Sequence, residues 1–411
     1  MKVQKSIEHV EGISLTIVMI IIILIPFSNI LHYVIPLPNI FGKSTWVVGP
    51  TLIMVFIYFY KVIRSHFFLS LDRFELVSWV LVILSILIFS IRSFVYNENV
   101  SYLTYRYIAT GFIYLYLVIK IVRNDKVLRF LAMAIVAQGF LVSLAQVINV
   151  HFFPTVALAI DAENIGYISF DTEKTRNMLQ GASISANLIL CAMFVMVAML
   201  KAKVLPLNYT FFWIFQLFML YAITLGGSRY PFIVGCLLII FNFFTFKSSK
   251  FRLSLIFIVI TILFSINYLF NFHSESIIRD YENYGDRIVR FTMPIQILGE
   301  SIQNFVIGSS IFQVGNTVSS DGNNTISDQS YFATALAFGV PLALAYFTTI
   351  FSVLKNRICN NISKWYFYYF ALSFAFTNCI LWENWLCVSI FSAVVISDLS
   401  QINPGGTQRY F

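Results

Sequence analysis

Long apolar runs alternate with short polar connections along most of this chain. Each run approaches the roughly 20 apolar residues that a helix needs to cross about 30 Å of hydrocarbon. Trp382-Glu383-Asn384 interrupts a run that is too long for one comfortable span, so we predict two helices there. The pattern predicts an all-α polytopic membrane protein with about twelve transmembrane helices. Helices are expected at residues 13–35, 45–60, 74–91, 101–119, 130–150, 177–200, 207–225, 230–246, 253–272, 330–354, 365–381 and 384–399.

One long polar interval breaks this alternation, at residues 273–328. It divides the chain into N-terminal transmembrane helices (1–272), a large loop (273–328), C-terminal transmembrane helices (329–400) and a short tail (401–411). A chain this apolar has little polar sequence outside its short connections. The large loop is therefore the first place to look for chemistry.

Composition and charge support a membrane protein. The 411 residues are 59% hydrophobic and 11% charged, whereas soluble domains carry roughly 25% charged residues. The net charge of +8 does not indicate nucleic-acid binding, because the basic residues fall into alternate loops, such as 61–73, 120–129 and 355–364. By the positive-inside rule, both termini are predicted to be cytoplasmic and the large loop to lie outside.

Several kinds of chemistry lack a sequence signature. The chain has no GxxxxGK[ST], no GxGxxG after a strand, no HExxH and no tandem acids, and its five histidines are scattered. The five cysteines form no CxxC pair. We therefore expect no nucleotide, metal or other cofactor and no disulfide framework.

Because most basic residues fall in loops predicted to be cytoplasmic, few arginines lie on the predicted outer side. Arg92 follows a predicted helix at a short outer loop. It is expected to sit at the headgroup level as an anchor, and its replacement by alanine is expected to be mild. Arg176, Arg229, Arg287 and Arg290 fit that interpretation less well.

The turn Gly226-Gly227-Ser228-Arg229 joins two predicted helices on the outer side. Ser228 and Arg229 would stand at the N-terminus of the second helix, where free backbone N–H groups favour an anion. A tight hairpin with an interfacial arginine explains the same residues.

Arg287 and Arg290 lie three residues apart in the large loop. On a helix they would share one face, and paired guanidinium groups bind phosphate in a bidentate manner. They could instead pair with neighbouring acids such as Asp286. The apolar spacing predicts a helix here, through Ile288, Phe291, Ile295 and Leu298.

Asp328 stands two residues before the start of the helix predicted at 330–354. It is a plausible N-cap of that helix. It could equally be a general base that faces the outer leaflet, with Tyr331 close by in the sequence.

Taken in their order along the chain, these motifs resemble those of the bacterial O-antigen polymerase (Wzy) and O-antigen ligase superfamily of integral-membrane glycosyltransferases. Arg176, followed by Gly181 and Ser185-Ala186-Asn187, resembles an outer-loop segment of that family. The other matching pieces are Gly227-Ser228-Arg229, Gly285-Asp286-Arg287, Ile307-Gly308-Ser309, Asp328-Gln329-Ser330-Tyr331 and Gly339-Val340-Pro341.

The resemblance implies a GT-C-like fold in the bacterial inner membrane and a glycan donor linked to undecaprenyl pyrophosphate. It implies catalytic roles for Asp328 and Arg287. Partners would be membrane lipids, a chain-length regulator protein and a flippase. Substrate-binding roles fall on Arg176, Arg229, Arg290, Ser228 and Tyr331.

Ligases of this superfamily usually carry a histidine-asparagine pair where this chain has Asp328-Gln329. The resemblance therefore favours a polymerase of O-antigen, capsule or exopolysaccharide. A ligase that transfers glycan to lipid A-core is the closest alternative. An alternative of another class is a flippase or transporter of lipid-linked oligosaccharides, for which the polar span residues are Arg106, Gln138, Gln146 and Gln216.

Overall fold

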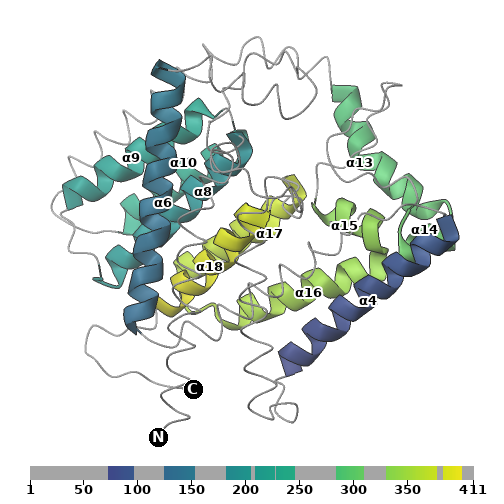
Figure 1. Ribbon diagram of the computed structural model, residues 1–411. Helices are drawn as coiled ribbons and strands as arrows, with labels where there is room; N and C mark the ends of the chain where they lie inside the picture. Colours follow the sequence, from purple (N-terminus) through teal and green to yellow (C-terminus); the bar gives the residue numbers. More distant parts are fainter. Residues whose placement is uncertain are drawn as a thin grey trace, which may run out of the picture. The chain divides into compact units, whose positions relative to one another are not determined.

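The computed structural model of the chain consists of α-helices throughout its described part (Figure 1). The helices predicted at 13–35, 45–60, 101–119 and 253–272 lie outside that part. The described residues are 73–96, 125–152, 182–204, 209–226, 228–245, 284–309, 330–376 and 383–399.

Contacts divide the chain into two compact units, Met1–Ala134 with Arg290–Phe411, and Ile135–Val289. We call them unit 1 and unit 2. The boundaries fall inside helices α6 and α13, so the units follow packing and not the hydropathy segments predicted from the sequence. The hydropathy segments describe a topology relative to the membrane, which packing within the chain does not test, so they stay a prediction.

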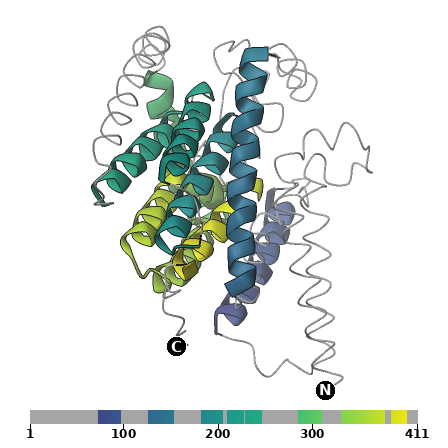
Figure 2. The same cartoon turned by 90° about the vertical axis from the view of Figure 1, so that its left-hand side faces the viewer.

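Unit 2 is built around helix α8 (Ala182–Lys201), in which residues 184–199 are all buried. Helices α9 (Tyr209–Leu225) and α10 (Arg229–Thr245) pack on α8 and on each other (Figure 2). Helix α6 (Asp125–Phe152) belongs to this unit from Ile135 onward. These boundaries agree with the predicted helices within a few residues.

Helices α6 and α8 approach closely at small residues. A Cβ placed on Gly139 would lie 2.1 Å from Cβ of Ala192. Small residues are the usual means by which membrane helices come this close. Within the described residues, two segments are long and apolar enough to cross a membrane, judged by length and composition alone, and both belong to these helices: Leu128–Ile148 and Ile184–Lys201.

Unit 1 contains the remaining described helices. Helix α16 packs against α4, α14, α15 and α17, and α17 packs against α18. In chain order these helices are α4 (Arg73–Tyr96), α13 (Tyr284–Gly299, in part), α14 (Ile302–Ile307), α15 (Ser330–Phe338), α16 (Val340–Asn356), α17 (Asn361–Phe376) and α18 (Glu383–Leu399).

The last helices test two sequence predictions. Helix α17 ends at Phe376 and α18 begins at Glu383, which confirms two helices around Trp382-Glu383-Asn384. The single helix predicted at 330–354 is wrong. The chain breaks at Gly339 into α15 and α16, because Gly339 has a positive φ of 85° and Pro341 opens the next helix.

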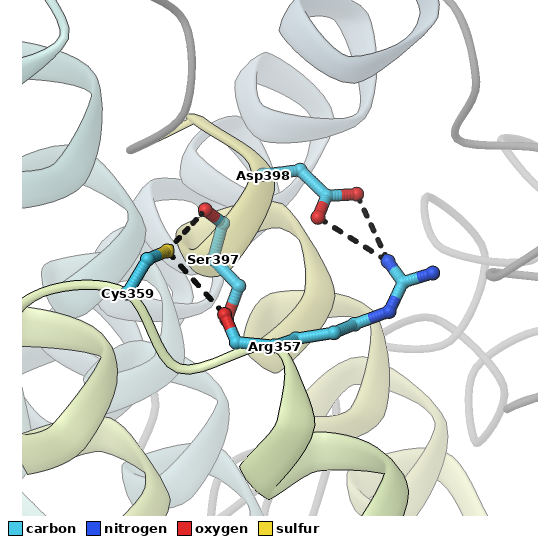
Figure 3. A network of polar contacts seen from close by, with 4 residues as sticks. All are labelled: Arg357, Cys359, Ser397 and Asp398. Atoms are coloured by element: carbon cyan, nitrogen blue, oxygen red, sulfur yellow. Dashed lines mark hydrogen bonds and ion pairs between the residues drawn. The ribbon is translucent and has the colours of Figure 1, made fainter. Parts of the chain in front are cut away.

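Polar contacts fasten the connection after α16 to the end of α18 (Figure 3). Arg357 Nη1 donates to both carboxylate oxygens of Asp398, at 3.2 Å and 3.1 Å. The Cys359 thiol donates to the backbone carbonyls of Ser397 and Arg357, at 3.2 Å and 3.3 Å. This end of unit 1 is therefore held by a charged pair and a thiol together.

Candidate functional site

The break between α15 and α16 leaves backbone acceptors that need new donors. In a continuous helix, the carbonyl of Ala337 would accept from the N–H of residue 341. Residue 341 is proline, which has no N–H. Unpaired carbonyls at a buried helix end are costly, and more so in a membrane, where water cannot replace the missing donor.

Two groups from distant parts of the chain supply these donors. The backbone N–H of Ser309 donates to the Leu336 carbonyl at 2.9 Å. The Arg92 guanidinium, from α4, donates through Nη1 to the Ala337 carbonyl and through Nη2 to the Ser309 carbonyl, the latter at 2.5 Å. A cation at the C-terminal end of a helix is also favoured by the helix dipole. We call this arrangement the Gly308–Gly339 crossing.

Both glycines of the crossing are required by geometry. Gly308 has φ 88° and Gly339 has φ 85°, which side chains with a Cβ rarely adopt. A Cβ on Gly308 would lie 2.4 Å from the Leu336 carbonyl oxygen, and one on Gly339 would lie 2.0 Å from that of Val306. Two backbone segments thus pass each other in direct contact.

Arg92 is not the headgroup anchor that the sequence suggested. Its side chain is only 1% exposed and lies between α4, the Gly308 turn and the end of α15. The predicted contact of its side chain with lipid headgroups is therefore wrong. Its partners are backbone carbonyls, so no side chain in the sequence marked them. The expectation that Arg92→Ala is mild no longer has a physical basis.

The crossing is tied to helix α13 as well. Asn304 of α14 donates through Nδ2 to the Ile297 carbonyl at 2.9 Å. Ile297 and Leu298 are buried in one cluster with Leu336 and with other residues of α15 and α16. Ile295, one of the apolar residues whose spacing predicted this helix, is 57% exposed.

Helix α13 contains both predicted phosphate-binding arginines. It spans Tyr284–Gly299, which confirms the helix predicted around Arg287 and Arg290. Their spacing of three places them on one face of that helix. The contacts of their side chains lie outside what the structure describes, as do Arg176 and Asp328 entirely. The roles predicted for these four residues stay predictions.

Tyr331 stands in the first turn of α15, and its contacts are those of packing. Its ring lies 4.6 Å from that of Phe347 and 5.9 Å from that of Phe374, measured between centroids. Its hydroxyl donates to the Ala371 carbonyl of α17 at 2.8 Å. These contacts orient the start of α15, and a substrate contact for Tyr331 stays a prediction.

In unit 2, the predicted turn is followed directly by a helix. Helix α10 begins at Arg229, and Ser228 before it is half-buried. The backbone carbonyl of Ser228 accepts a hydrogen bond from the N–H of Phe232 at 3.3 Å. The same unit contains a polar pair that was not predicted from the sequence. Nε2 of His151, at the end of α6, lies 2.8 Å from the hydroxyl of Tyr221 in α9. Both residues stand near helix ends that were predicted to face outward. This shared side was the signal in the sequence that they could meet.

Buried amide side chains form a second polar feature of unit 2. Gln138, Gln146 and Gln216 are at most 2% exposed, so they face protein. Gln216 donates to the Met193 carbonyl of α8 at 3.1 Å. Asn187, which belongs to the motif piece after Arg176, and Asn242, which no motif contains, are equally buried. Polar residues inside membrane bundles commonly mark functional sites.

The described part of the chain contains no group of three or more His, Cys, Asp or Glu side chains that could hold a metal ion. The charged group at the Gly308–Gly339 crossing is instead a guanidinium bonded to backbone. Comparisons with protein-family models, with curated proteins and with solved structures found no match.

Proposed function

We propose that this chain is a polysaccharide polymerase of the bacterial inner membrane. It joins repeat units carried on undecaprenyl pyrophosphate into O-antigen, capsule or exopolysaccharide chains at the periplasmic face. The fold would be GT-C-like, with about twelve transmembrane helices. A flippase that delivers the repeat units and a chain-length regulator would be its partners.

One observation carries this proposal, the Gly308–Gly339 crossing. The two glycines belong to separate pieces of the motif series that resembles the polymerase superfamily. In the structure, these pieces lie in backbone contact. The crossing connects α13, which contains Arg287 and Arg290, to α15, which starts two residues after Asp328. The candidate phosphate-binding residues and the candidate base thus lie, in the sequence, within or beside the helices that the crossing joins.

The chemistry suits such a junction. An acceptor-sugar hydroxyl oxygen would attack the anomeric carbon of the donor glycan. The bond from that carbon to the pyrophosphate oxygen would break, leaving undecaprenyl pyrophosphate. Asp328 would take the hydroxyl proton as general base. Arg287 and Arg290 would stabilise the negative charge that develops on the leaving pyrophosphate.

Contacts between helix ends support the proposed multi-pass topology. Arg357 and Asp398, which bond to each other, both lie at ends predicted to be cytoplasmic. Lys201 lies 5.3 Å from the ring centroid of Phe241, again between two predicted cytoplasmic ends. His151 and Tyr221 join two predicted outer ends. Each contact joins ends that the positive-inside rule assigns to one side.

Deleting the gene tests the proposal through the surface polysaccharide. A polymerase deletion should leave lipid A-core with at most one repeat unit, because flipping and ligation continue. A ligase deletion would leave bare core, with polymer still on its lipid carrier. Long chains attached to core in the deletion strain would refute both activities.

A flippase remains the second candidate, favoured by the buried amides of unit 2. Gln138 and Gln216 are nearly inaccessible, yet both lie in strongly apolar helices. Transporters place such groups near the membrane midplane. Loss of a flippase would trap single lipid-linked repeat units on the cytoplasmic face. Units accessible from the periplasmic face in the deletion strain would exclude it.

A further inference from the structure

We propose that Arg92 is a positioning residue that holds the two backbone segments of the Gly308–Gly339 crossing at the spacing that the proposed reaction requires. Resting on the proposed function, this inference adds a residue that the motif series does not contain. Arg92 lies in α4, far in sequence from the large loop. Its guanidinium bonds to the Ser309 carbonyl on one side and to the Ala337 carbonyl on the other.

The helix break after α15 lacks one backbone N–H donor. Pro341 removes the N–H that Ala337 would have met in a continuous helix. Arg92 replaces it with a charged donor, and hydrogen bonds from charged groups are stronger than neutral ones. Because the side chain is 1% exposed, no solvent donor competes for the same carbonyl. Without Arg92, the break after α15 would leave that acceptor buried and unsatisfied.

The shape of the guanidinium allows it to join two carbonyls. Its planar fork presents several N–H groups in fixed directions. Here two of its nitrogens reach carbonyls on two different backbone segments. The distance between those segments is thereby fixed by a rigid group. A lysine ammonium has one nitrogen and cannot set that distance in the same way.

The two backbone segments that Arg92 joins lie next to different helices. Ser309 follows α14, and α14 is bonded to the end of α13 through Asn304 and Ile297. Ala337 lies near the end of α15, whose first residues follow Asp328 in the sequence. Loss of the Arg92 bonds would therefore let the end of α13 shift relative to α15. Misplacement of this kind reduces catalysis without removing a catalytic group.

Hydrogen exchange tests the holding role independently of any activity. The full-length protein in lipid nanodiscs is compared with Arg92→Met and Arg92→Gln. Exchange of the Ser309 amide, which donates to Leu336, should become roughly tenfold faster or more in both variants, because charged hydrogen bonds are lost. Arg357→Met is the matched control, since it removes another interhelical arginine of unit 1 and should leave Ser309 unchanged. If Arg92→Met fails to accumulate, Arg92→Gln decides, and unchanged exchange in it overturns the proposal.

The positioning role is tested by polymer made per protein molecule in cells. Arg92→Gln should lower this rate about tenfold or more, and Arg92→Lys should recover part of it at equal protein level. A purely structural role would change the protein level and leave the rate per molecule at the wild-type value, and that result overturns positioning. If the deletion strain keeps its polysaccharide ladder, the proposed function fails, while the exchange measurement still decides whether Arg92 holds the crossing.

Discussion

Replacing Gly339 with alanine should strongly destabilise unit 1. Gly339 has φ 85° and ψ 157°, a region that is almost restricted to glycine and costs other residues about 1–3 kcal/mol. The new Cβ would also meet the Val306 carbonyl oxygen at 2.0 Å and its carbon at 2.4 Å. Relieving such overpacking typically costs about 1–3 kcal/mol. The two terms together give a loss of roughly 2–6 kcal/mol, a large part of a typical stability of about 5–15 kcal/mol.

Gly299 provides the matched control, because it ends α13 and a Cβ there would meet nothing within 4 Å. Titration of the purified protein from mild detergent into SDS, followed by tryptophan fluorescence, compares the two variants. Gly299→Ala should unfold with the wild type, within about 0.5 kcal/mol. Gly339→Ala should unfold at much lower SDS. Equal midpoints for Gly339→Ala and wild type would refute the backbone contact on which the crossing depends.

Three further predictions concern the large loop and the proposed chemistry. Arg287→Ala should abolish the polysaccharide ladder, and Arg287→Lys should lose most of it, because lysine lacks the bidentate fork; a normal ladder from the alanine variant at normal protein level would contradict phosphate binding. Asp328→Asn separates a base from an N-cap, since asparagine caps about as well but cannot accept the proton; a wild-type ladder from it would exclude catalysis. A cysteine introduced at Asn323 should react with a membrane-impermeant thiol reagent added outside the inner membrane, and labelling only from the cytoplasm would overturn the topology.

Hydropathy was sufficient to locate most described helices. The helix predicted at 207–225 is observed at Tyr209–Leu225, and the one predicted at 384–399 is observed at Glu383–Leu399. The reason is physical, since a helix that is apolar on all sides has to be covered, by protein or by lipid. Helix α13 was predicted with equal success from its apolar spacing, although Ile295 turned out to be exposed.

Hydropathy could not locate the crossing. Gly339 and Pro341 do not interrupt an apolar average, so the break after α15 was missed. The partners of Arg92 are 217 and 245 positions away and are backbone carbonyls, which every residue possesses. No side chain pattern can identify such a partner. The motif series did single out Gly308 and Gly339, but only the structure shows that they lie against each other.

The crossing also sets an order for biosynthesis. A chain is made from its N-terminus, so α4 and the Gly308 turn exist before α15 leaves the ribosome. The carbonyls at the end of α15 can be satisfied as soon as they appear, since Arg92 and Ser309 have already been made. A C-terminal fragment that starts at residue 330 would fold without either donor. The packing of the last helices of this protein therefore depends on segments synthesised before them.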